Sequence, residues 1–133
     1  MILLRLQDVL IGNLSQYDMT LTNANSATAY LVIDDITTSN SVFSVISYPD
    51  SLLPGESDNI TIGFSPQNSG EETGDLTILS NDNNSPHAIS LSGTGVIPPD
   101  ISINILLFLA RIISTHLFAY FGSILSNKIA STL

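Results

Sequence analysis

The chain has 133 residues, 44% of them hydrophobic, a formal net charge of −9 and no cysteine. The hydrophobic content excludes a disordered chain, and the lack of cysteine excludes a disulfide framework and a thiolate metal site. All twelve acidic residues but only one of the three basic residues lie in the first hundred positions, which gives −11 there. Because such a surface repels phosphate backbones, we expect no nucleic-acid partner.

Segments in the first half of the chain show the period of two that marks a half-buried strand. We expect a first strand from Leu4, followed by Tyr17–Leu21, Tyr30–Ile36 and Phe43–Val45. Asp34 and Asp35 interrupt the third of these as a turn, after which Ile36 returns to the inner face. The stretch 48–56 is rich in turn formers and should be a connection.

Three further strands are expected between Ser57 and Val96, and a turn separates each pair. The first turn is 67–74, with Gly70 and Gly74 as turn residues, and Gly93–Gly95 ends the last strand. The side chains expected to face the core are Ile60, Ile62, Phe64, Leu76, Ile78, Ile89 and Leu91. About seven short strands at this spacing predict an all-β fold over residues 1–98, a Greek-key sandwich of the immunoglobulin-like kind.

The motifs of this second half resemble those of ASH (hydin-like) immunoglobulin-like domains. The same pattern occurs in bacterial choice-of-anchor D repeats and, more distantly, in major-sperm-protein-like domains. The matching residues are Phe64, Ser65, Pro66, Gly70, Gly74, Leu76, Ile78, Ser80, Asn81, Asp82, Pro86, Leu91, Ser92, Gly93, Thr94 and Gly95. The resemblance implies an immunoglobulin-like fold, but one fold hosts many functions.

The beginning of the chain departs from the family pattern. Leu6–Gly12 stands where the family has an F-G-x-V-x-x-G step, and the usual lead-in before it is missing. Met1–Leu6 also lacks the charged region and cleavage site of a signal peptide. We therefore expect that the domain starts upstream or that the chain is a fragment.

The composition changes after a stiff spacer, 97–100, and residues 99–133 form an apolar tail that we expect to be helical. The range 103–125 holds a single charge, Arg111, and is long enough for a membrane-spanning helix. Arg111 would cost about 2.5–3.5 kcal/mol in a bilayer. Three interpretations stay open: a membrane or amphipathic helix, the truncated start of a second repeat (Phe121–Leu125 resembles the F-G-x-V step), and a tail packed on the sandwich or on a partner.

No pattern in the sequence indicates catalysis. There is no phosphate-binding loop, dinucleotide fingerprint or nucleophile elbow, and neither His87 nor His116 has a second ligand at metal spacing. Asp34-Asp35 and Asp82, expected in turns, are the only candidates for calcium, and turn aspartates more often bond to the local backbone. We therefore assign no catalytic, cofactor-binding or metal-binding residue, and expect neither an enzyme nor a cofactor.

These observations predict a non-enzymatic structural or interaction module of a larger cell-surface or secreted repeat protein. Its partners would be proteins held at sheet edges or end loops, neighbouring repeats, and a membrane contacted through 103–125. Two alternatives follow from the resemblance. One is a cytoskeletal or ciliary scaffold of the hydin-like type, with a cytoplasmic or ciliary location. The other is an accessory domain of a secreted hydrolase.

The tail gives a first test. If 103–125 spans a bilayer, alkaline carbonate should leave the full-length protein in the membrane pellet of its source cells, because carbonate removes proteins held only at the surface. Truncation after residue 102 should then release the protein into the supernatant. Clean extraction of the full chain would contradict a spanning helix.

Overall fold

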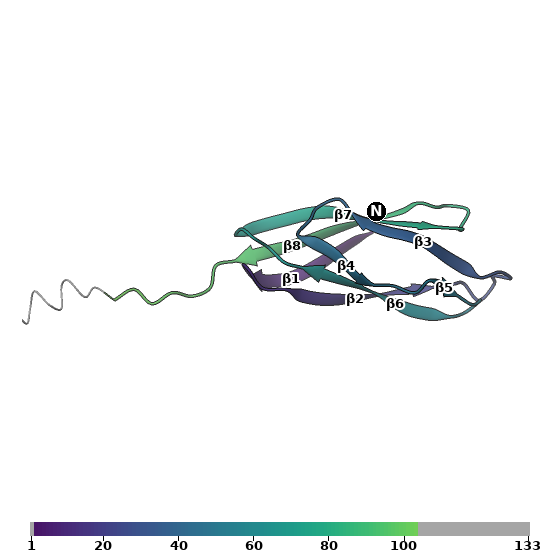
Figure 1. The fold of residues 1–133 in the computed structure, drawn as a ribbon, viewed down its shortest axis with the longest axis horizontal. Helices are drawn as coiled ribbons and strands as arrows, with labels where there is room; N and C mark the ends of the chain where they lie inside the picture. Colours follow the sequence, from purple (N-terminus) through teal and green to yellow (C-terminus); the bar gives the residue numbers. More distant parts are fainter. Residues whose placement is uncertain (1, 104–133) are drawn as a thin grey trace, which may run out of the picture. The chain divides into compact units, whose positions relative to one another are not determined.

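The computed structural model describes residues 2–103, whose first compact unit ends at Pro98. This unit is built from strands (Figure 1). In chain order they are β1 (Leu3–Leu10), β2 (Ser15–Thr22), β3 (Leu31–Thr38), β4 (Phe43–Ser47), β5 (Ser51–Leu52), β6 (Ser57–Phe64), β7 (Gly70–Ser80) and β8 (His87–Val96). The all-β prediction is confirmed, and the expected connection 48–56 contains the two-residue strand β5.

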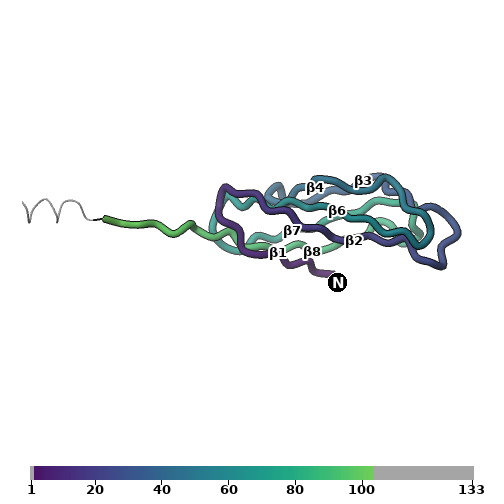
Figure 2. The backbone as a smooth tube through the Cα atoms, turned by 90° about the horizontal axis from the view of Figure 1, so that it is seen from below, coloured from purple at the N-terminus to yellow at the C-terminus, as the bar shows by residue number. Residues whose placement is uncertain are grey.

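The strands form two sheets that pack face to face (Figure 1), and in Figure 2, seen from below, the strands of the two sheets overlie one another. One sheet has the order β1-β8-β7-β3-β5 and the other β2-β6-β4. β1 runs parallel to β8, whereas the other pairs are antiparallel. Neighbouring strands are often not consecutive in the chain, and the chain crosses several times from one sheet to the other. This arrangement is the immunoglobulin-like sandwich that the sequence predicts.

The core lies between the sheets and follows the period-two pattern of the sequence. All seven side chains that the sequence places inside are buried, and Ile60, Ile62 and Phe64 of the central strand β6 are fully so. Phe43 of β4 stacks on Phe64, with ring centroids 5.0 Å apart and planes 18° from parallel. Burying large side chains of this kind contributes about 1.5–3 kcal/mol each, so this central stripe supplies much of the stability.

The aromatic pair lies against glycines of the opposite sheet. A Cβ atom on Gly93 of β8 would lie 2.6 Å from Cε1 of Phe64, and one on Gly74 of β7 would lie 3.1 Å from Cδ2 of Phe43. The predicted turn 67–74 is too long, because β7 begins at Gly70 and Gly74 lies inside this strand, and β8 does not end at Gly93–Gly95 but continues to Val96. Gly74 and Gly93 make room for the rings rather than bending the chain.

A second difference concerns Asp34 and Asp35, which lie within β3 and not in a turn. The register of β3 on β7 shifts between Ile33 and Asp35, as in a β-bulge. The extra residue lets the chain stay extended while Ile33 and Ile36 both face the core, at 6% and 5% exposure. The interruption in the sequence pattern thus marks a bulge.

Residues 97–103 form neither helix nor strand. The helical tail and its alternatives fall on residues outside the described part of the chain. Within residues 2–103 no helix has the length and apolarity needed to cross a membrane.

The contact between Gly93 and Phe64 predicts a non-additive pair of substitutions. Gly93→Ala should destabilise the domain by about 1–3 kcal/mol, because the new methyl group overlaps the ring. In a Phe64→Leu background the same change should cost less, by a coupling of about 0.5–3 kcal/mol. Urea unfolding of the wild type, the two single variants and the double variant measures this double-mutant cycle. If the two losses in the free energy of unfolding simply add, Gly93 does not make room for the ring of Phe64.

Candidate interaction surface

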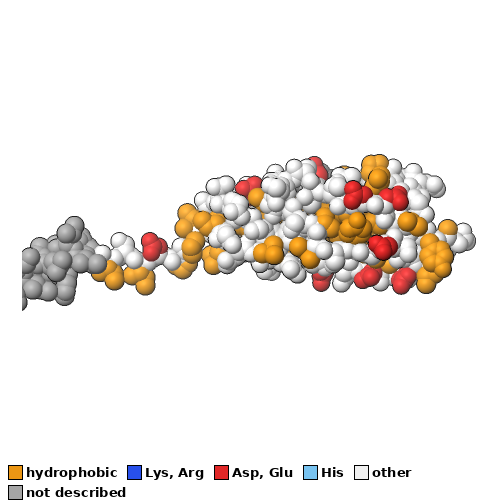
Figure 3. Space-filling model, viewed as in Figure 1, with side chains coloured by type: hydrophobic (Ala, Val, Ile, Leu, Met, Phe, Trp, Pro, Cys, Tyr) orange, Lys and Arg blue, Asp and Glu red, His pale blue; other side chains and the backbone are white. Residues whose placement is uncertain are grey.

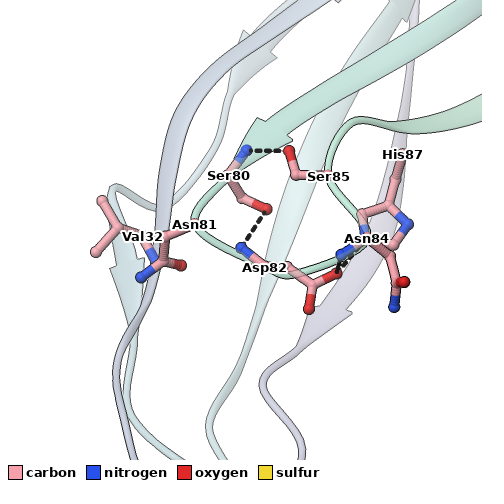
Figure 4. Close-up of polar contacts among 7 residues, drawn as sticks. All are labelled: Val32, Ser80, Asn81, Asp82, Asn84, Ser85 and His87. Atoms are coloured by element: carbon pink, nitrogen blue, oxygen red, sulfur yellow. Dashed lines mark hydrogen bonds and ion pairs between the residues drawn. The ribbon is translucent and has the colours of Figure 1, made fainter.

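Hydrogen bonds of one asparagine, Asn81, hold the loop between β7 and β8 to the neighbouring strand β3. Oδ1 of Asn81 accepts a hydrogen bond from the amide of Val32 at 2.9 Å, and its Nδ2 donates to the carbonyl of Tyr30 at 3.1 Å. The backbone amide of Asn81 donates to the carbonyl of Val32 at 3.2 Å. Asn81 thereby extends the ladder between β3 and β7 past the end of β7 (Figure 4).

Serine and aspartate side chains close the same loop internally (Figure 4). The Ser80 amide donates to Oγ of Ser85 at 2.9 Å, and the Asn84 amide donates to Oδ2 of Asp82 at 3.2 Å. The hydroxyl of Ser80 accepts a longer bond of 3.4 Å from the Asp82 amide. The family motif Ser80-Asn81-Asp82 therefore stabilises the loop, because each of its polar side chains forms a hydrogen bond with nearby backbone.

His87, the first residue of β8, lies beside this loop with Nε2 at 2.6 Å from Oδ2 of Asp82. This hydrogen bond is the main reason why the pKa of the Asp82 carboxyl is lowered, and the Asn84 amide adds to the effect. Both side chains are exposed to solvent. Their pairing orients the end of the hairpin, and no serine or threonine hydroxyl bonds to His87 among the polar contacts of residues 2–103.

The candidate calcium ligands do not come together. Asp34 and Asp35 lie in β3, whereas Asp82 lies in the β7–β8 loop with His87. Among the described residues no three histidine, aspartate or glutamate side chains are grouped closely enough to hold a metal ion. His116 falls outside those residues.

A groove of about 650 Å³ lies between the edge of β2 and the first residues of β8. Its apolar lining comes from both sheets: Met19 and Leu21 of β2, Leu31 and Ile33 of β3, Ile78 of β7 and Ile89 of β8. Thr20, Thr22, Asp82 and His87 also contribute to it. A groove of this size and character is typical of a binding site.

The groove borders the first residues of β8, ahead of the point where the pairing with β1 begins among residues 2–103. β1 pairs with β8 from Leu3–Ser90 onward, and the Ser90 amide donates to the carbonyl of Ile2 at 2.9 Å. Within residues 2–103, His87–Ile89 therefore have a strand neighbour only on the β7 side. In Figures 1 and 2 the N-terminal end of β1 lies near the middle of the sandwich, and the end of the sandwich that carries the β7–β8 hairpin lies beyond it.

The described surface is acidic. Residues 2–103 contain twelve acidic side chains and one basic side chain, Arg5. Figure 3 shows hydrophobic patches that lie between acidic groups, and no lysine or arginine is visible on that face. A binding partner of this surface meets a negative potential.

Sequence reasoning named sheet edges and end loops in general but did not locate the groove. Met19 and Leu21 of the expected strand Tyr17–Leu21 are half-buried and line the groove. No local pattern locates the groove, because its walls come from strands that are far apart in the chain.

Comparisons with known proteins agree on the kind of domain. Residues 3–94 match the family described as HYDIN/CFA65/VesB-like, Ig-like domain. The search of curated proteins finds no match. Among solved structures, the ASH/PapD-like domain of human CEP192 (PapD-like domain 7) superposes with a TM-score of 0.60 at 12% identity, covering 73% of this chain and 82% of that one.

Two bacterial structures are similar to this chain over only part of their own length. A protein of unknown function from Porphyromonas gingivalis W83 gives a TM-score of 0.61 at 19% identity, covering 69% of this chain and 43% of that one. The Vibrio cholerae VesB protease gives 0.55 at 18% identity, covering 70% and 30%. At these identities the likeness concerns the fold.

The Asp82–His87 contact predicts an acid-dependent contribution to stability. The pKa of Asp82 is lower in the folded chain than its usual value of 3.8, so the ionised carboxylate stabilises the fold above that value. This contribution should disappear as the pH falls through the lowered pKa. Urea unfolding of the wild type and Asp82→Asn, from about pH 6 down to pH 2, should show a difference that shrinks toward the acid end.

The variant His87→Ala is the control for this prediction. It should raise the pKa of Asp82 toward 3.8, because the largest cause of the shift is removed and the Asn84 amide remains. Carboxyl chemical shifts followed by NMR measure the pKa directly. A pKa of Asp82 that is the same with and without His87 would contradict the assignment.

Proposed function

The chain belongs to the family of HYDIN/CFA65/VesB-like Ig-like domains, and from that premise we propose that it is a protein-binding module of a larger cell-surface or secreted repeat protein. Domains of this family are interaction modules, and the fold hosts function on its surface. The single observation that carries the proposal is the apolar groove between β2 and the first residues of β8. β2 is the outer strand of its sheet, and a strand edge with an apolar hollow next to it fits a protein partner.

The placement at the cell surface rests on the acidic composition and on the resemblance to bacterial choice-of-anchor D repeats. One basic side chain against twelve acidic ones in residues 2–103 keeps such a module soluble. In this proposal neighbouring repeats contact the ends of the sandwich, and the tail 99–133 links the module to a membrane or to the next repeat.

Two other settings are supported by specific findings. The family description includes HYDIN and CFA65, which favours the cytoskeletal or ciliary scaffold as a second candidate. The likeness to part of the VesB protease favours an accessory domain beside a catalytic one. In all three settings the sandwich binds protein and performs no chemistry itself.

Antibody labelling of source cells separates the surface setting from the ciliary one. An antibody raised against residues 2–98 should label intact cells as strongly as permeabilised ones if the module faces outward. Amine-directed labels are a poor choice, because the only lysine of the chain is Lys128, in the tail. Labelling that requires permeabilisation, with the protein in the cytosolic fraction, would overturn the surface placement.

A further inference from the structure

We propose that the outer face of the large sheet holds a second binding site, a polar hollow around Ser92 that binds a neutral sugar. The hollow lies over β1, β8 and β7, and its lining offers both hydrogen-bond donors and acceptors. The inference goes beyond the proposed function, because it concerns another part of the surface and another class of ligand than a protein chain.

A bulge in β1 brings two charged side chains to this face. Arg5 pairs with Ser92 and Asp8 pairs with Thr94, so three steps along β1 correspond to two steps along β8. Because β1 has one extra residue between these pairs, Arg5 and Asp8 both lie on the outer face of the sheet. Bulges often lie next to functional sites, where they redirect a side chain.

Ser92 lies at the bottom of the hollow. It points to the outer face, because Leu91 and Gly93 on either side of it face the core. Two adjoining hollows of about 480 and 270 Å³ meet there, and Ser92, Arg5 and Glu71 line both of them. The larger of the two falls within the range of about 300–1,000 Å³ that is usual for small-molecule sites.

The polar groups at this point are not paired with one another. Ser92 is only 5% exposed, and among the side-chain hydrogen bonds and ion pairs of residues 2–103 none involves Ser92, Arg5 or Glu71. The Ser92 hydroxyl is in contact with the hollow, because no side-chain oxygen of the described residues is both fully buried and without a partner. By contrast, the neighbouring Ser90 hydroxyl donates to Asp75 at 3.2 Å. Ser92 thus offers a ligand a nearly enclosed hydroxyl, where a hydrogen bond is stronger than on an open surface.

The charges around the hollow define the ligand. Asp8, Glu71 and Asp75 outnumber Arg5 there, so an anion is repelled. The guanidinium of Arg5 lines both parts of the hollow and disfavours a cation. A neutral ligand with many hydroxyl groups avoids both costs, since a hydroxyl can donate to a carboxylate or accept from the guanidinium.

The spacing of the polar side chains suits a sugar ring. Arg5, Ser92 and Thr73 lie opposite one another on three neighbouring strands, which are about 4.8 Å apart. Thr94 and Glu71 form the next row along β8 and β7. Such a grid can bond to several hydroxyl groups of one rigid ring, and its position on strands fixes it before the ligand arrives, which lowers the entropic cost of binding.

The test uses the full-length protein and four neutral probes, the methyl glycosides of glucose, galactose, mannose and N-acetylglucosamine. Saturation-transfer NMR detects binding, and amide chemical shifts locate it. We expect at least one probe to bind in a saturable way, to shift amides within 71–75 and 90–94, and to keep its affinity when salt is added. Methyl glucuronide, which places a carboxylate on the glucose ring, should bind more weakly than methyl glucoside.

Two substitutions in β7 form a matched pair. Thr73→Val and Thr77→Val each remove one hydroxyl from the outer face of the same strand, but only Thr73 lines the hollow. Thr73→Val should weaken binding about three- to tenfold, whereas Thr77→Val should bind as the wild type does. Ser92→Ala should weaken binding by a similar factor, and Arg5→Met by about tenfold or more, because hydrogen bonds to charged groups are stronger. Thermal unfolding shows whether each variant keeps its fold.

Each outcome decides the inference. If no probe binds in a saturable way up to its solubility limit, the inference is wrong. Tighter binding of the glucuronide than of the glucoside would identify an anion site and would also overturn it, as would an affinity that folded Thr73→Val and Arg5→Met variants leave unchanged. Should Ser92→Ala fail to fold, those two variants still decide. A negative result leaves the proposed function standing, because that proposal rests on the groove between β2 and β8.

Discussion

The sandwich depends on the fit between two stacked phenylalanines and two glycines. Phe43 and Phe64 lie side by side on the small sheet, and Gly74 and Gly93 face them from the large one. Side chains at these two glycine positions would meet the rings, so the fit sets how closely the sheets approach. Because close-packed interiors transmit strain, the spacing at this point influences the packing of the whole core.

The exposed surface has its groove at the end that holds the β7–β8 hairpin, where apolar side chains of both sheets line the hollow between β2 and β8. Asn81 ties the hairpin to β3, so the open end has a defined shape. A binding surface that is already ordered before a partner arrives lowers the entropic cost of binding.

The chemistry of the surface agrees with a binding role. The polar residues of the family motif Ser80-Asn81-Asp82 bond to nearby backbone, and His87 is held by Asp82. They build the loop that flanks the groove. What remains for a partner is the outer edge of β2, an apolar floor and a negative potential.

The sequence by itself determined the strands, the core and the family. Alternation of apolar and polar residues identifies Ile60, Ile62, Phe64 and Leu91 as core, because a period of two places every second side chain on one face of a sheet. Only the tertiary structure decided the roles of Gly74 and Gly93 and the bulge at Asp34-Asp35. It alone also located the groove, where the edges of β2 and β8 meet. A glycine in a sequence is equally compatible with a turn and with close packing against an aromatic ring. Which strand lies at the edge of a sheet is decided only when strands far apart in the chain have paired.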